Sequence, residues 1–319
     1  MSKYARNILR LGLGIGALVP LTLVPSAITA PGPTLTGMAL AVLYAALVLW
    51  LLTLTRPAWP QGRKWIFAAL LWGSGTSLSV VFIAGSSWSD IVDYWQWDAL
   101  GASLGGAYPE EIVKALGVFL LLATYRELHS PWHGFLAGAV VGLGFETSEN
   151  IFYGFMGALT DPVSDWGGFW NTWLLRIVFG TCLHVVFTGI AGWGLGWAIF
   201  AAGWSRTKRI GYAGGFLGLA FAGHFTWNLM IDTQAWWAYV PQSYQLLSST
   251  QRFLSLLAEH INSPRQMTLP RLMRPNLKVV RHAFLVESNR AYSLGLLRSR
   301  LHSPHWQTPF IFRIFPHER

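Results

Sequence analysis

Six ionisable side chains stand inside segments that are otherwise apolar enough to cross a membrane. They are Glu110 and Glu111, Glu146 and Glu149, and the histidines His184 and His224. A charged residue near the bilayer centre costs about 3 kcal/mol on insertion scales, so such residues face protein or water and usually mark function. These six side chains are therefore the first candidates for a functional site.

Carboxylates and imidazoles gathered in one buried place suit two kinds of hydrolysis. In the first, His184, His224 and a carboxylate such as Glu146 bind Zn²⁺ with an open fourth position, and another glutamate accepts a proton from water. In the second, which needs no metal, a buried glutamate deprotonates water directly while imidazole and Asn side chains stabilise the oxyanion. The sequence leaves both routes open.

Further polar residues lie at helical spacing from the six, because residues three or four apart share one face of a helix. Lys114 lies one turn from Glu110 and can pair with it, and Arg176 is predicted to share a helical face with His184. These supporting residues are Lys114, Asn150, Arg176 and Asn228. A structural salt bridge would explain why Glu110 and Lys114 are present but would not explain Glu111. A single histidine in a membrane helix usually serves as a hydrogen-bonding partner between helices.

The segment from Gly138 to Tyr153 places two of the carboxylates in a glycine-rich helix. Gly138 and Gly142 fall on the same helical face as Glu146 and Glu149. Glycines at four-residue spacing let another helix approach closely in lipid. We therefore expect these carboxylates to be pressed against a neighbouring helix.

Seven apolar runs are each long enough to cross about 30 Å of hydrocarbon. They cover about residues 11 to 30, 34 to 55, 65 to 86, 102 to 124, 134 to 158, 171 to 200 and 213 to 238. Residues 241 to 261 form a weak or re-entrant candidate for an eighth. The predicted fold is an all-α, polytopic membrane helical bundle with about seven to eight transmembrane helices. Within the fourth run, Pro109 precedes two acids and predicts the start of a helix there.

Composition agrees with a membrane protein, since hydrophobic residues make up 53% of the chain, charged residues 12%, and the mean hydropathy is +0.39. The single cysteine, Cys182, excludes an internal disulfide framework and a cysteine-based zinc cluster. The net charge of +9 comes from short loops and the C-terminal tail. Membrane topology and contact with anionic lipid explain it better than nucleic-acid binding.

The loops between the apolar runs alternate in charge. Basic loops carry Arg56, Arg63, Lys64, Arg126, Arg206, Lys208 and Arg209, and the opposite loops carry Asp90, Asp93, Asp98, Asp161 and Asp165. The positive-inside rule then predicts a multi-pass protein of the cell membrane with a cytoplasmic N-terminus. Helical rise places all six candidate residues in the middle to outer half of the membrane.

This organisation predicts three parts. Residues 1–100 form N-terminal transmembrane helices, residues 101–240 form a catalytic transmembrane core, and residues 241–319 form a basic tail that is poorly ordered or interfacial. The tail shows no metal, phosphate or nucleophile pattern, so we take it as non-catalytic.

Four motifs in order resemble the PrsW family of intramembrane proteases. They are Glu110-Glu111-x-x-Lys114, the run G-A-V-V-G-L-G-F-E-T-S-E-N from Gly138 to Asn150, His184, and H-F-T-W-N from His224 to Asn228. In the related type II CAAX prenyl endopeptidases, the paired glutamates are usually followed by an arginine at a longer spacing, whereas in this chain they are followed by Lys114. The chain therefore resembles the PrsW family more than the prenyl endopeptidases, and the resemblance covers about residues 102 to 230.

The resemblance implies an enzyme that cleaves membrane-anchored anti-sigma factors at a site outside the cytoplasm. It implies Glu110, Glu111 and His184 as the catalytic centre, with contributions from Glu149, Asn150, His224 and Asn228. PrsW-like enzymes are classed as metalloproteases, which makes zinc the candidate cofactor, whereas the prenyl relatives are argued to be glutamate enzymes.

The predicted function is therefore an intramembrane endopeptidase acting on a membrane-anchored substrate in the lipid bilayer. One alternative is a proton- or ion-coupled transporter, since buried acids and histidines also build relays. Transporters often show interrupted segments in two corresponding halves, whereas the polar residues here crowd into the fourth to seventh runs. A non-enzymatic membrane scaffold or immunity protein is the other alternative.

Overall fold

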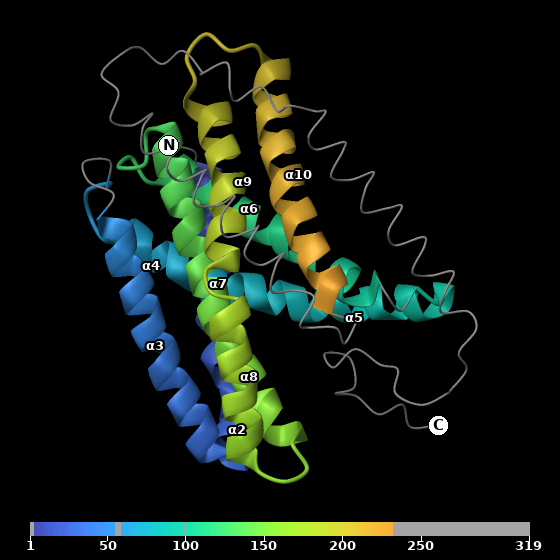
Figure 1. The fold of residues 1–319 in the computed structure, drawn as a ribbon. Helices are drawn as coiled ribbons and strands as arrows, with labels where there is room; N and C mark the ends of the chain where they lie inside the picture. The colour runs from blue at the N-terminus through green and yellow to red at the C-terminus, as the bar shows by residue number, and fades with distance from the viewer. Residues whose placement is uncertain (1–2, 55–58, 98–99, 232–319) are drawn as a thin grey trace. The chain divides into compact units, whose positions relative to one another are not determined.

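A computed structural model of the protein describes residues 3–54, 59–97 and 100–231, and the elements in these ranges are all helical (Figure 1). The α-helices are α1 (Lys3–Gly16), α2 (Val24–Thr29), α3 (Pro31–Thr53), α4 (Lys64–Leu71), α5 (Leu78–Trp95), α6 (Tyr108–Thr124), α7 (Pro131–Thr160), α8 (Asp165–Phe179), α9 (Leu183–Phe200) and α10 (Arg206–Ile231). A 3₁₀-helix, η1 (Val19–Leu23), and two π-helices, η2 (Trp72–Ser77) and η4 (Ser103–Ala107), connect some of them. The predicted tail at 241–319, including the weak segment 241–261, lies outside the described residues.

The prediction of a helical membrane bundle is confirmed. Four stretches of the described chain are long and apolar enough to span a bilayer: Lys3–Thr29, Pro31–Thr53, Lys64–Trp95 and Leu183–Phe200. The helices α6, α7 and α10 carry the acidic, imidazole and amide side chains of the predicted site, and none of the three is among these four stretches.

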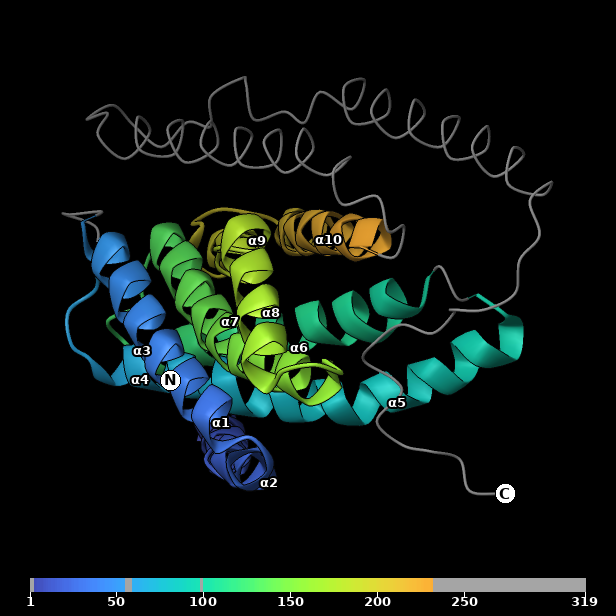
Figure 2. The same ribbon diagram turned by 60° about the horizontal axis from the view of Figure 1, so that its bottom comes forward.

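Helix α7 is the central element of the described bundle. Figures 1 and 2 show it between α3 on one side and α9 and α10 on the other. A Cβ atom at Gly134, Gly138 or Gly142 would collide with the backbone of α9, closer than the 3.0 Å that real Cβ atoms keep. The expectation that these glycines allow a close helix approach is therefore confirmed for Gly138 and Gly142.

Helix α6 begins where its sequence predicts. Pro109 occupies the first turn of α6, and Glu110 and Glu111 follow in the same turn. The chain does not break before this helix, because the π-helix η4 leads directly into it. Single-turn π segments are frequent beside functional sites.

Two predicted spans are divided in the structure. The run at 171 to 200 forms two helices, α8 and α9, because Cys182 adopts a left-handed backbone conformation with φ of 63°. The prediction that Arg176 and His184 share the face of one helix was therefore wrong. The run at 11 to 30 is divided among α1, η1 and α2 where Pro20 and Pro25 interrupt it.

Candidate active site

The first turn of α6 places three charged side chains in the protein interior. Glu110, Glu111 and Lys114 are 4%, 1% and 0% exposed. The Nζ atom of Lys114 lies 3.2 Å from Oε2 of Glu110 and 2.7 Å from Oε1 of Glu111. The predicted pairing of Lys114 with Glu110 is present, and the same ammonium group also holds Glu111. Two neighbouring carboxylates can remain buried together because they share this cation.

Two histidines from α9 and α10 face these carboxylates. Nδ1 of His184 lies 3.7 Å from Oε2 of Glu110, and Nε2 of His224 lies 3.8 Å from the same oxygen. Nδ1 of His224 hydrogen-bonds to Oε1 of Glu111 at 2.9 Å. The two imidazole rings are 5.0 Å apart. Residues from three helices thus meet at the Glu110 carboxylate.

The hydrogen bonds assign a tautomer to each histidine. Lys114 can only donate, so Nδ1 of His184 accepts from it at 3.1 Å, and Nε2 of His184 donates to Oε2 of Glu149 at 2.8 Å. Nδ1 of His224 donates to Glu111, which leaves Nε2 of His224 as the acceptor. The acceptor nitrogens of both histidines therefore lie near Oε2 of Glu110, and the one on His184 also accepts from Lys114.

This set of donors fits a metal ion. One ligand atom from each of Glu110, Glu111, His184 and His224 lies within 4.8 Å of the others, and all four residues are buried. Tetrahedral Zn²⁺ with bonds of about 2.0–2.2 Å sets its ligands about 3.3–3.6 Å apart. The Glu110 to histidine separations of 3.7 and 3.8 Å need to close by only a few tenths of an ångström. Oε2 of Glu111 is also buried without a hydrogen-bond partner, so this oxygen is available to a bound metal ion or water molecule.

Glu149 on α7 orients His184 from the side opposite Lys114. Its Oε2 atom accepts from His184 and also pairs with Nη2 of Arg176, at 2.6 Å. Nε of Arg176 donates to Oδ1 of Asn150, and the guanidinium lies 4.4 Å from the centre of the Tyr153 ring. Arg176 thus joins α8 to the site across the helix break. Glu149 contacts Nε2 of His184, the ring nitrogen that points away from Glu110. Carboxylates commonly fix the orientation of metal-binding imidazoles in this way.

Glu146 lies behind His184 and outside the four-residue group. Its carboxylate accepts hydrogen bonds from the backbone N–H groups of Cys182 at 2.8 Å and His184 at 3.1 Å. These groups start α9, where N–H groups without helical partners favour a negative charge. The sequence suggested Glu146 as a metal ligand, whereas in the structure Glu110 lies with the histidines and Glu146 holds the helix that carries one of them.

Tyr44 is a contributor that the sequence reasoning missed. Its hydroxyl donates to Glu146 and accepts from the backbone N–H of Cys182 at 2.9 Å, reaching the site from α3. A tyrosine in an apolar span gives no motif, so only the fold could reveal this contact. Asn228, which the sequence did indicate, donates to the carbonyl of Ala102 at 3.0 Å. A Cβ atom on Gly106 would contact both Asn228 and Glu110, which places this amide beside the carboxylate.

Comparison with known protein families agrees with this arrangement. A family model described as PrsW family intramembrane metalloprotease matches residues 61–253, more than half of the 319-residue chain. The chain belongs to the PrsW family. The PrsW match covers α6 to α10 and with them every predicted site residue, whereas Tyr44 lies before it.

One curated relative is Protease PrsW from Geobacillus kaustophilus (strain HTA426). It is 29% identical over 148 residues, which cover 46% of this chain and 59% of the relative. The chain therefore spans somewhat more than half of the length of this PrsW relative. No solved structure matches the chain.

Proposed function

We propose that this protein is an intramembrane endopeptidase that hydrolyses a peptide bond of a membrane-anchored protein. The observation that carries the proposal is the buried group of Glu110, Glu111, His184 and His224, in which one carboxylate oxygen has no partner. Membership of a family described as intramembrane metalloproteases supports it. Because these four side chains are buried in a membrane bundle, we propose that the substrate reaches them from the lipid.

In the proposed mechanism, Glu110, His184 and His224 are the residues that would hold a zinc ion, the histidines through their acceptor nitrogens Nδ1 and Nε2. The bound metal would supply Lewis acidity for the scissile carbonyl and for the attacking water. Glu149 and Glu111 keep the two imidazole rings in the tautomers that expose these nitrogens.

Glu111 is proposed as the general base. Its unpartnered Oε2 atom accepts a proton from the attacking water, whose oxygen bonds to the carbonyl carbon. As the C–N bond breaks, Glu111 passes this proton to the departing amine nitrogen. The side-chain amide of Asn228, beside Glu110, is the donor available to the carbonyl oxygen during this step. Lys114 holds the Glu111 carboxylate in place through an ion pair.

The proposed substrate is a single-span or secreted membrane-anchored protein such as an anti-sigma factor, cut near the extracytoplasmic face. This assignment extends the family resemblance and gives the enzyme a role in signalling. We also propose that residues 101–240 form the catalytic core, with the helices of residues 1–100 before it, and that the N-terminus is cytoplasmic.

The test compares cells carrying the wild-type protein with cells carrying Glu111→Gln or His184→Ala. We expect truncated fragments of the substrate in the membrane and secreted proteomes of wild-type cells, and a loss of about 100-fold or more in each variant. The control is Asp165→Asn, which removes an exposed carboxylate in the first turn of α8 and should leave processing unchanged.

Unchanged processing in both site variants, at wild-type expression, would overturn the proposal. Metal analysis of the purified protein separates the two routes to hydrolysis. One zinc per chain, lost in a His184→Ala/His224→Ala double variant, supports the metal route. A zinc-free protein that retains its protease activity supports direct deprotonation of water by a glutamate.

A further inference from the structure

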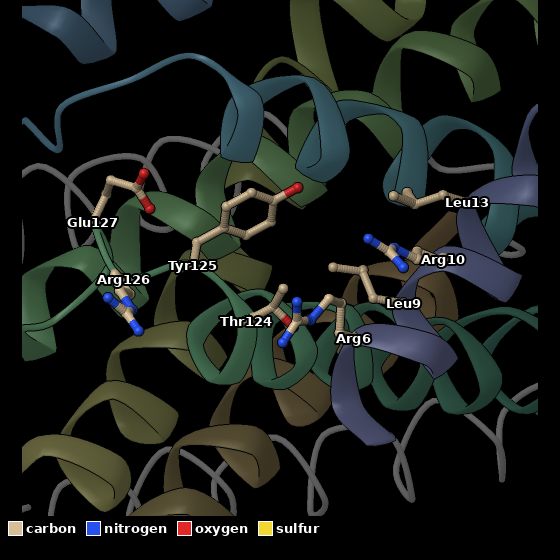
Figure 3. Close-up of a pocket in the computed structure, with 8 residues that line it drawn as sticks. All are labelled: Arg6, Leu9, Arg10, Leu13, Thr124, Tyr125, Arg126 and Glu127. Atoms are coloured by element: carbon tan, nitrogen blue, oxygen red, sulfur yellow. The ribbon is translucent and has the colours of Figure 1, made fainter. Parts of the chain in front are cut away.

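A basic pocket lies away from the candidate active site, between α1 and the C-terminal end of α6. It has a volume of about 330 Å³ and is lined by Arg6, Leu9, Arg10, Leu13, Thr124, Tyr125, Arg126 and Glu127. Figure 3 shows Arg6 and Arg10 extending from α1 into the pocket, with Thr124 beside Arg6, while Arg126 and Glu127 lie at its other end. The lining thus contains three arginines and one glutamate, so the pocket carries an excess of positive charge.

The arginines and the threonine of this pocket have no salt-bridge or hydrogen-bond partner for their side chains in the described part of the chain. No salt bridge among the described residues involves Arg6, Arg10 or Arg126. Thr124 is only 7% exposed, and its hydroxyl oxygen has no hydrogen-bond partner. A buried hydroxyl is normally paired with protein or with a bound group. An unpaired hydroxyl beside the Arg6 guanidinium, with Arg10 in the same pocket, suits a phosphate group.

Tyr125 adds a second hydroxyl to the same pocket. Burial and the nearby Glu127 carboxylate raise the pKa of this phenol, while Arg10 opposes the rise. The phenol therefore remains protonated at neutral pH and can donate a hydrogen bond to an anion. The pocket thus offers hydroxyl donors as well as cations.

The position of the pocket indicates where its ligand comes from. Arg6 and Arg10 lie on an apolar helix that belongs to a candidate membrane span, and Leu9 and Leu13 form the apolar part of the lining. Thr124 is the last residue of α6, so the pocket opens at a helix end. Charge at the end of a membrane segment, above apolar side chains, matches the headgroup level of a bilayer.

We propose that this pocket binds the phosphate group of an anionic lipid headgroup between Arg6, Arg10 and Thr124. The guanidinium groups pair with phosphate oxygens, and the Thr124 and Tyr125 hydroxyls donate to the same group. The acyl chains lie along the apolar residues of α1. Free phosphate has the same charge chemistry, but it would not use the apolar lining.

The test measures binding to the full-length purified protein by thermal stabilisation in detergent. The probes are phosphatidylglycerol, phosphatidylcholine and sodium phosphate, each over the same concentration range. We expect stabilisation by phosphatidylglycerol alone. In an Arg6→Gln/Arg10→Gln variant the apparent affinity for phosphatidylglycerol should fall about 25-fold, because each basic residue contributes about fivefold at an anionic surface.

Two further variants separate the pocket from general charge attraction. Thr124→Val keeps the volume and charge of the pocket and should weaken binding about fivefold by removing one hydrogen bond. Arg206→Gln/Lys208→Gln removes two exposed charges at the start of α10, outside the pocket, and should leave the affinity unchanged.

Three results would each overturn the proposal. One is wild-type affinity for phosphatidylglycerol in the Arg6→Gln/Arg10→Gln variant. Another is an equal loss in the Arg206→Gln/Lys208→Gln control, which would mean general charge attraction. The last is stabilisation by sodium phosphate as strong as that by phosphatidylglycerol, which would assign the pocket to a free anion.

Discussion

His184 has a different partner on each ring nitrogen, and the pair of contacts determines what it can do. Glu149 accepts the proton of one nitrogen, and the other faces Lys114 and Glu110. A bound cation at Glu110 and the ammonium of Lys114 would compete for that lone pair. Lys114 therefore has to move aside when a metal binds, while its hold on Glu111 can persist.

The first prediction concerns Glu149. In Glu149→Gln the charge that fixes the His184 ring is lost, and Arg176 loses its carboxylate partner. We expect zinc affinity to fall about 10- to 100-fold, as is usual when such an outer partner is removed. A zinc titration followed by calorimetry measures this, with Asp165→Asn as the control. Equal affinities in Glu149→Gln and the wild type would contradict the orienting role.

A second prediction concerns the Tyr44 hydroxyl, which joins Glu146 to the start of α9. Tyr44→Phe keeps the ring and removes about 1 kcal/mol of hydrogen bonding. Backbone amides at residues 182–184 should then exchange faster with deuterium, and kcat should fall more than KM changes. Tyr94→Phe, at a side chain that is 80% exposed, is the matched control. Unaltered exchange at 182–184 would show that the hydroxyl does not hold this helix start.

Most site residues could be predicted from the sequence for a simple physical reason. Charges in apolar segments are costly, so Glu110, Glu111, Glu146 and Glu149 stand out without knowledge of the fold. The separate role of each glutamate could not be predicted, because it depends on which helix the side chain contacts. Glu146 meets the backbone of α9, whereas Glu110 meets two imidazoles. Tyr44 could not be found at all, since tyrosine is common in membrane helices.

At the scale of elements, the break between α8 and α9 brings the site together. An uninterrupted helix would carry Arg176 and His184 along one face, but the left-handed residue Cys182 lets both approach Glu149 from separate helices. Periodicity could not predict the break, because the apolar pattern runs through it. The stabilising contacts are the two N–H groups that donate to Glu146, and these come from tertiary structure.

The glycine contact between α7 and α9 gives a third prediction. In Gly142→Ala the new methyl group would collide with the carbonyl of His184, so the helices must separate. We expect a loss of about 1–3 kcal/mol in unfolding free energy together with reduced activity. Gly214→Ala, on α10 where no described atom lies within 4 Å, should be neutral or slightly stabilising. Similar thermal stability of the two variants would show that α7 and α9 can tolerate separation.

At the scale of the whole molecule, the distribution of charge in the loops predicts its orientation in the membrane. Basic residues gather at the start of α10, and acidic residues lie in the turn between α7 and α8. By the positive-inside rule we expect the basic residues in the cytoplasm and the acidic residues outside. The helices α6, α7 and α10, which carry polar site residues, are not among the four candidate membrane spans of the described chain.

The fourth prediction tests this orientation. The only cysteine is first replaced in Cys182→Ser, and Val163→Cys or Arg206→Cys is then added. Val163 is 90% exposed in the turn after α7, and Arg206 begins α10. A membrane-impermeant maleimide should label Val163→Cys in intact cells and Arg206→Cys only after permeabilisation. The reverse pattern would place the N-terminus outside.

The backbone contact between α7 and α9 also has a mechanical consequence. At Gly134, Gly138 and Gly142 the backbone of α7 lies directly against that of α9, so no side-chain rotamer can absorb movement at these three points. We therefore expect Glu146, Glu149 and His184 to move together. Between α9 and α10 more of the contact is made by side chains: Gly194 meets the Phe216 side chain as well as the backbone carbonyl of Tyr212, and Gly223 meets the Phe187 side chain. If a polypeptide substrate reaches the carboxylates, we therefore expect α10 and His224 to shift more than α9 and His184.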